Sequence, residues 1–185
     1  MRKFLYVMLA VTLSACVANP ARESKYPAEI VGMGNSQNFP FTAAGYRRGR
    51  SYMYAPDMKD YSIAYNRFDS RLQNAVTLYF YESPHTLREQ FKAEKSAIIK
   101  MHQNVAIGKE SAVTFNKNGI LYKGMVARFH IQGMFSNVDQ PLSSELILIR
   151  TQKRFLKIRS TAPLAEGARS REQVRKLMDV VNWAY

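Results

Sequence analysis

The pattern that most restricts the fold is a strict alternation of apolar and polar side chains over residues 74–81. One face of the expected strand carries Val76, Leu78 and Phe80, and the other carries Thr77, Tyr79 and Tyr81. A strand of this kind buries one face against a core and leaves the other wettable. The alternation therefore predicts a sheet with a half-exposed, tyrosine-bearing surface.

Other segments share strand-like composition or periodicity. They are residues 46–54 and 61–66, which we expect to form a hairpin, and residues 112–115, 120–132, 145–151 and 154–160. Asn118-Gly119 is a strong hairpin-turn signal. A loop is expected where Gly133, Asn137, Asp139 and Pro141 interrupt the pattern.

Two segments have helical periodicity. Ser83 as N-cap and Pro84 at the first position predict a helix ending near His102, with an apolar stripe that Glu94 interrupts. A second helix is expected from Arg171, with Ser170 as N-cap and Gln173 completing a capping box. Glu172 and Lys176, four residues apart on this helix, are expected to pair.

These elements predict an α+β fold in which both helices cover one face of an antiparallel sheet. The fold is expected to occupy residues 45–185 as a single domain, with Leu78, Phe91 and Phe129 buried between helix and sheet.

The N-terminus reads as an export signal. Arg2 and Lys3 precede an apolar run of twelve residues, 4–15, which ends at Cys16. A transmembrane helix needs about 20 apolar residues, so this run is too short to be one. Residues 1–15 are therefore a predicted signal peptide, and the proline-rich and glycine-rich residues 16–44 a predicted tether and irregular segment.

The stretch Leu13-Ser14-Ala15-Cys16 resembles the lipobox of bacterial lipoprotein precursors. The resemblance implies cleavage before Cys16, lipid on its thiol and often on its new amine, and attachment to a membrane. Because Val17 stands where an aspartate favours retention in the inner membrane, it implies the outer membrane, facing the periplasm. The alternative is an ordinary secretory signal with an incidental cysteine.

The order of elements over residues 45–185 resembles the PsbP and Mog1 family of α/β/α sandwiches, in which a meandering sheet carries a long helix after its first strands and another at the C-terminus. That resemblance implies a fold and leaves the function open.

The cysteine count and the net charge limit which functions are possible for the mature chain. Cys16 is the only cysteine, so the mature chain has no thiol for a disulfide, a metal or catalysis. Loss of Arg2 and Lys3 with the signal leaves 25 basic against 14 acidic residues, or +11. Export argues against nucleic acid as the partner and favours an anionic envelope component or a protein. The alternative is that the charge serves only solubility.

Residue patterns for catalysis are weak. His85, His102 and His130 have no metal-site spacing, and no Gly-x-Ser-x-Gly elbow occurs. We therefore assign no catalytic residue, no metal site and no cofactor from the sequence.

Basic and aromatic residues occur together in the first and last hairpins. The candidate residues for binding an anionic ligand or a partner are Arg47, Arg48, Arg50, Arg150, Arg154 and Arg159. Because Lys157 and Arg159 alternate with Leu156 and Ile158, an ordinary solvated strand explains part of this pattern equally well. The leading hypothesis is a non-catalytic, membrane-anchored accessory, assembly or binding factor. The alternatives are an envelope enzyme with an unrecognised site and a small-molecule carrier.

Overall fold

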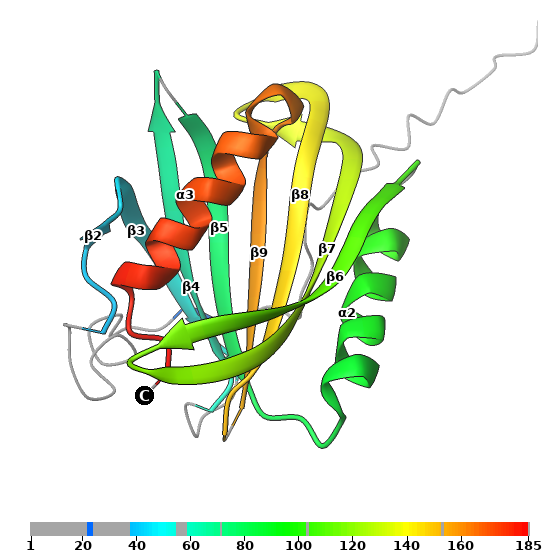
Figure 1. Cartoon of the computed structure of the whole chain (residues 1–185). Coiled ribbons are helices and arrows are strands. Elements are labelled where there is room, and N and C mark those ends of the chain that lie inside the picture. The colour runs from blue at the N-terminus through cyan, green and yellow to red at the C-terminus, as the bar shows by residue number, and fades with distance from the viewer. Residues whose placement is uncertain are drawn as a thin grey trace, which may run out of the picture.

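The chain folds around one antiparallel sheet (Figure 1). The computed structural model describes residues 22–23, 38–54, 59–70, 72–102, 104–152 and 154–184. Its nine strands are ordered β1-β3-β4-β5-β9-β8-β7-β6, and β2 pairs with β3 outside this order. The strands are β1 (Arg22–Glu23), β2 (Thr42–Ala43), β3 (Tyr46–Met53), β4 (Tyr61–Asp69), β5 (Leu72–Tyr81), β6 (Ala106–Lys117), β7 (Ile120–Phe135), β8 (Val138–Arg150) and β9 (Phe155–Pro163). The α+β class is confirmed, whereas Cys16 and the signal lie outside the described residues.

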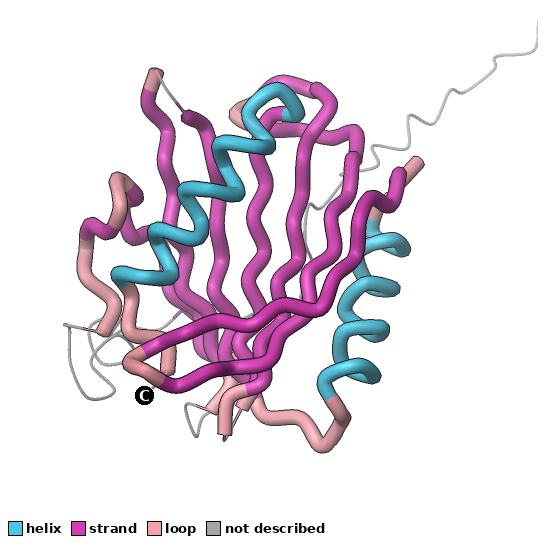
Figure 2. Tube along the Cα trace, in the orientation of Figure 1, coloured by secondary structure: helices cyan, strands magenta, loops and turns pink. Residues whose placement is uncertain are grey.

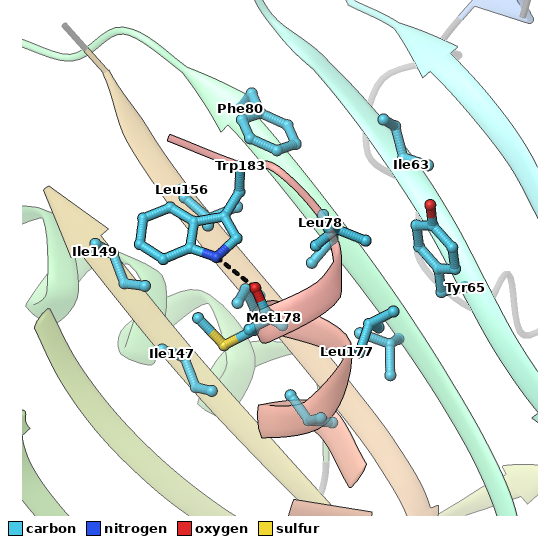
Figure 3. Close-up of a cluster of buried hydrophobic side chains, with 14 of the residues drawn as sticks. Ile63, Tyr65, Leu78, Phe80, Ile147, Ile149, Leu156, Leu177, Met178 and Trp183 are labelled. Carbon is cyan, nitrogen blue, oxygen red and sulfur yellow. Dashed lines mark hydrogen bonds between the residues drawn. The ribbon is translucent and has the colours of Figure 1, made fainter. Parts of the chain in front are cut away.

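One face of the sheet carries α3 (Gly167–Val180), which crosses it diagonally (Figure 1). The helix buries Val174, Leu177 and Met178 against the sheet. Their partners from the sheet include Leu78, Phe80, Ile147, Ile149, Leu156 and Ile158, and Trp183 lies among them (Figure 3). The indole Nε1 of Trp183 donates to the Met178 carbonyl at 2.9 Å, which ties the chain after α3 to its last turn.

The other face carries α2 (Leu87–Met101), which packs on β7 and β8. Phe91 and Ile98 of the helix are buried in a second cluster with Phe129 and Leu148. Leu78, Phe91 and Phe129 are each at most 2% exposed, which confirms the predicted core positions.

The strand β8 shows that the helices lie on opposite faces. Leu146 and Leu148 belong to the α2 cluster, whereas Ile147 and Ile149 belong to the α3 cluster. Successive side chains of a strand point to opposite faces. The prediction that both helices cover one face is therefore wrong, because β8 is apolar on both sides and each side needs a cover.

The hairpin of β6 and β7 bends across the face of the sheet toward the C-terminal end of α3 (Figure 2). Asn118 and Gly119 form its turn with φ of 54° and 79°, which confirms the predicted Asn-Gly hairpin. The rings of Tyr122 and Trp183 meet edge to face at 5.2 Å. The hairpin thereby closes one end of the α3 core.

Lys117 of this hairpin caps α3. Its Nζ donates to the carbonyls of Asp179 at 2.6 Å and Met178 at 3.3 Å, which are among the last carbonyls of the helix. Burial lowers the pKa of Lys117, although nearby Asp179 opposes this shift.

Both helices begin elsewhere than predicted. The N-cap of α2 is Thr86, whose hydroxyl and the Glu89 carboxylate form a capping box, so the assignment of Ser83 and Pro84 to the start of the helix is wrong. The helix α3 begins at Gly167, and Ser170 lies inside it. A Cβ at Gly167 would come within 2.5 Å of the Ser143 hydroxyl, so only glycine allows the start of α3 to pack this closely on β8.

The loop predicted around residues 133–141 is also wrong. Strands β7 and β8 continue to a two-residue turn, in which Ser136 and Asn137 take φ of 51° and 65°. Pro141 fits inside β8 because pairing of β8 with β9 begins only at Leu142, so its missing N–H breaks no bond on that side.

Candidate functional site

The α2 side of the sheet is covered only in part. Because α2 packs mainly on β7 and β8, neither described helix packs over this side of β3 and β4, and α2 reaches β5 chiefly at Tyr81. We call this surface, together with the flanking side chains of β9, the open face. It carries Arg47, Tyr52, Ser62, Asn66, Thr77, Tyr79, Tyr81, Lys157 and Arg159.

Strand register places these side chains in rows. Tyr52, Ser62, Tyr79 and Lys157 are successive cross-strand partners on β3, β4, β5 and β9. The neighbouring row ends with Thr77 beside Arg159. Most of these side chains are neither fully buried nor fully exposed, as the alternation in β5 predicts.

A polar network joins the open face to α2. The carboxylate of Glu94 accepts from the Tyr81 hydroxyl at 2.7 Å, from Gln90 Nε2 at 3.1 Å and from Lys157 Nζ at 3.0 Å. Ser83 donates to the side-chain oxygen of Gln90 at 2.8 Å, which orients that amide. The network holds α2 at a defined position along the edge of the open face.

Ionisation in this network follows from burial and charge. Burial would raise the pKa of Glu94, but the charge of Lys157 and the hydrogen bonds from Tyr81, Lys157 and Gln90 together lower it. Burial and then the adjacent Glu94 carboxylate raise the pKa of Tyr81 well above its ordinary value. At neutral pH the tyrosine is therefore a hydrogen-bond donor to a carboxylate.

Cation–ring contacts line the same region. Lys157 Nζ lies 4.3 Å from the centre of the Tyr79 ring and 5.7 Å from that of Tyr81. The guanidinium of Arg150 lies 4.5 Å from the centre of the Phe155 ring, and its Nη1 donates to the Ser83 carbonyl at 3.1 Å. These contacts hold positive charge against aromatic faces.

Arg159 lies near the C-terminal end of α2. Its Nη2 donates to the Ser144 hydroxyl at 3.1 Å, and the Thr161 hydroxyl lies 3.4 Å from the same oxygen. Burial and then the charge of Arg159 lower the pKa of His102, which follows α2. The imidazole is thus held toward its neutral form beside a fixed cation.

The arginines predicted in the first hairpin are divided by strand alternation, which separates Arg47 from Arg48, and by a register shift between Arg48 and Ser51, where Arg50 lies. Arg47 is exposed on the open face, with its guanidinium 5.0 Å from the centre of the Phe41 ring. Arg48 pairs with Tyr65 on the α3 side and donates to the Phe39 carbonyl. Arg50 is exposed within the irregular segment.

The arginines predicted in the last hairpin are also divided. Arg159 belongs to the open face, and Arg150 lies beside the start of α2. The Arg154 guanidinium lies toward the α3 side, 5.9 Å from the ring centres of both Tyr61 and Phe80. The structure therefore places Arg47, Arg150 and Arg159 on the α2 side of the sheet, and Arg48 and Arg154 on the α3 side.

Sequence reasoning missed Glu94 and Tyr81 as members of the site. The available signal was the acidic residue inside the apolar stripe of α2, because a carboxylate that faces a sheet needs a partner there. Lys157, its partner, had been grouped with the basic residues of the last hairpin.

No protein-family model matches the chain, and no curated protein matches it. None of the described helices is long and apolar enough to cross a membrane. Within the described ranges, no three His, Cys, Asp or Glu side chains gather as a metal site would require. His85 and His130 are exposed on separate elements.

Proposed function

We propose that the protein is a lipid-anchored lipoprotein of the bacterial envelope that acts as a binding or assembly factor, and that its open face takes an acidic segment of a protein partner. The observation that carries the proposal is the composition of that face. The described strands β3, β4, β5 and β9 present Arg47, Lys157 and Arg159 there and no carboxylate of their own, and of these three cations Lys157 pairs with Glu94 of α2.

The anchor is supported by the lipobox. Cys16 follows Leu13-Ser14-Ala15, and two or three acyl chains at this position hold a protein firmly where one is marginal. Val17 supports the outer membrane, with the domain facing the periplasm. The resemblance to the PsbP and Mog1 sandwiches rests on the order of elements in the sequence, and the proposed function does not depend on it.

The shape of the open face favours a narrow ligand. An α-helix with its side chains is about 10 Å thick, so α2 stands above the sheet beside Tyr81 and Lys157. A flat bilayer resting on α2 would not reach these residues, whereas an extended polypeptide fits alongside the helix. Tyrosine and arginine, with tryptophan, are enriched among the residues that dominate binding energy at protein interfaces.

The experiment uses the full lipidated chain in detergent micelles and a fluorescent poly-glutamate peptide. We expect Arg47→Glu to weaken binding about tenfold, the equivalent of 1.4 kcal/mol, and Tyr79→Ser to weaken it as well. Lys92→Glu, an equal charge change on an exposed residue of α2, is the matched control and should change affinity little.

Two outcomes contradict the partner assignment. Equal losses for Arg47→Glu and Lys92→Glu would show that only net charge matters. Binding of lipopolysaccharide without binding of the peptide would make an anionic envelope component the ligand. The anchor is tested separately, because Cys16→Ala should abolish acyl labelling and release the protein from the membrane fraction.

A further inference from the structure

The position of β1 limits how far the body of the protein can lie from its anchor. Arg22 of β1 pairs with Met53 at the end of β3. Cys16 is six residues before Arg22, and a fully extended chain of six residues spans about 20 Å. A lipid on Cys16 therefore keeps Met53 within roughly this distance of the membrane surface, plus the width of one strand pairing, about 5 Å.

The same length decides which end of the sheet faces the membrane. Strand β4 runs from Tyr61, the partner of Met53, to Asp69 at the opposite end. The eight residue-to-residue rises from Tyr61 to Asp69 correspond to about 26 Å along the strand, and the turn after Asp69 adds to this length. An upright molecule resting on the Asp69 end would place Met53 beyond the reach of the tether, so the Met53 end faces the lipid.

The turn between β6 and β7 lies beyond this same end. One row of strand partners crosses the sheet from Met53 through Tyr61, Phe80, Leu156 and Ile149 to Gly124. Strand β7 starts four residues before Gly124, at Ile120, so the turn projects past the row on the anchored side. In Figure 1 the hairpin bends across the sheet on the side of α3, and its turn lies beside the C-terminus.

This turn carries apolar side chains in an exposed position. Ile120 is 47% exposed and Leu121 is 67% exposed directly after the Asn118-Gly119 turn. Neighbouring Tyr122 is buried against Trp183, so the turn is held in place by the α3 core. Exposed aliphatic side chains on a turn that is held in place, at the end of the domain nearest the proposed anchor, are suited to contact with a membrane.

We propose that Ile120 and Leu121 enter the headgroup layer of the membrane that holds Cys16 and thereby set the tilt of the domain. The inference rests on the proposed lipid anchor. With the domain upright in this way, the open face runs along the membrane normal and stays accessible from the periplasm.

Charge contributes little to this contact. The described residues near this end include the cations Lys59, Lys117, Lys123, Arg150 and Arg154 and the acids Asp60, Glu82 and Asp179, which leave two positive charges in excess, and the Nζ of Lys117 is held by the last carbonyls of α3. Added salt screens surface charges but leaves apolar contacts in place. We therefore expect the contact to persist at high salt.

The experiment places an environment-sensitive dye on the turn. The lipid on Cys16 blocks its thiol, so Leu121→Cys supplies the one free thiol of the lipidated full-length protein. The matched control is Ser70→Cys in the exposed turn between β4 and β5 at the opposite end. Both are reconstituted in vesicles of phosphatidylethanolamine and phosphatidylglycerol that contain a lipid spin-labelled near the headgroup.

We expect the dye at position 121 to lose most of its emission, at low and high salt alike, and the dye at position 70 to keep it. Vesicle-bound protein with an unquenched dye at position 121, or with equal quenching at both positions, would overturn the inference and leave the anchor intact. Protein that fails to sediment with vesicles would overturn the anchor and the inference together.

Discussion

Truncation of Phe91 tests whether the three layers form one cooperative unit. Phe91 is 2% exposed and joins α2 to the sheet within the cluster that includes Phe129 and Leu148. Cutting a buried phenylalanine to alanine costs about 3 to 5 kcal/mol. Small domains have total stabilities of about 5 to 15 kcal/mol, so Phe91→Ala should remove a large share. If the free energy of unfolding falls by about 2 kcal/mol per molar urea, the urea concentration at the midpoint of unfolding should fall by about 2 M.

The assay uses the single tryptophan as a reporter on the opposite side of the sheet. Trp183 lies in the α3 cluster, so its fluorescence reports the layer that Phe91 does not touch. Far-UV circular dichroism follows the whole chain, and exposed Lys92→Ala in α2 is the control, expected within about 0.5 kcal/mol of the unmodified protein. A midpoint shift below about 0.5 M would refute the packing argument. A shift in circular dichroism without one in Trp183 fluorescence would refute the single cooperative unit.

Two further perturbations follow from buried polar groups. Burial, opposed by a hydrogen bond from Asn74 and the charge of Arg67, raises the pKa of Tyr46 from 10.0 to about 12. The contribution of neutral Tyr46 to stability should be complete below pH 10 and should be lost as pH rises through 12. Tyr46→Phe should therefore make the loss of stability with rising pH less steep, as monitored by tyrosinate absorbance. An unchanged pH dependence of unfolding would contradict this. Glu94→Gln should destabilise the domain by about 1 to 3 kcal/mol, because it leaves Lys157 partly buried without its carboxylate. Lys176→Ala, at the exposed pair with Glu172, should have no measurable effect in the same thermal melts, and equal losses would contradict the role of burial.

Local patterns predicted much of the architecture. The alternation over residues 74–81 appears in β5 as strictly alternating burial, and the Asn118-Gly119 turn forms where expected. Glu172 and Lys176 pair at 2.7 Å, as their spacing predicts. In each case the residues that carry the signal are also the residues that form the structure, and they are close together in the sequence. Tertiary packing therefore has little opportunity to override the local preference.

Element boundaries were less predictable because competing local signals were present. The predicted helix start was Ser83-Pro84, and the prediction passed over Thr86-x-x-Glu89, which forms both bonds of a capping box. Likewise, Ser170 precedes Gln173 at capping-box spacing, yet its hydroxyl lies 3.2 Å from that of Ser160 in the core. The packing of Gly167 on Ser143 extends α3 past the expected cap.

The candidate site also contains both features that local patterns predict and features that they do not. Arg47 and Arg48 are adjacent in sequence, yet one faces the open face and the other bonds to Phe39 on the α3 side. This separation follows from the alternation of side chains along β3, which sequence reasoning did not apply to these two arginines. Glu94 and Lys157 are 63 residues apart, and no local pattern predicts their pairing.

By itself the sequence determined which side chains of each element share a face, because helical and strand periods are properties of the local backbone. It also determined the lipobox on which the proposed anchor rests. Only the tertiary structure decided which face each helix covers, because both sides of β8 are apolar and either could have received α2. Of the two described helices, neither then packs over the tyrosines and cations of β3 and β4, since α2 spans mainly β7 and β8.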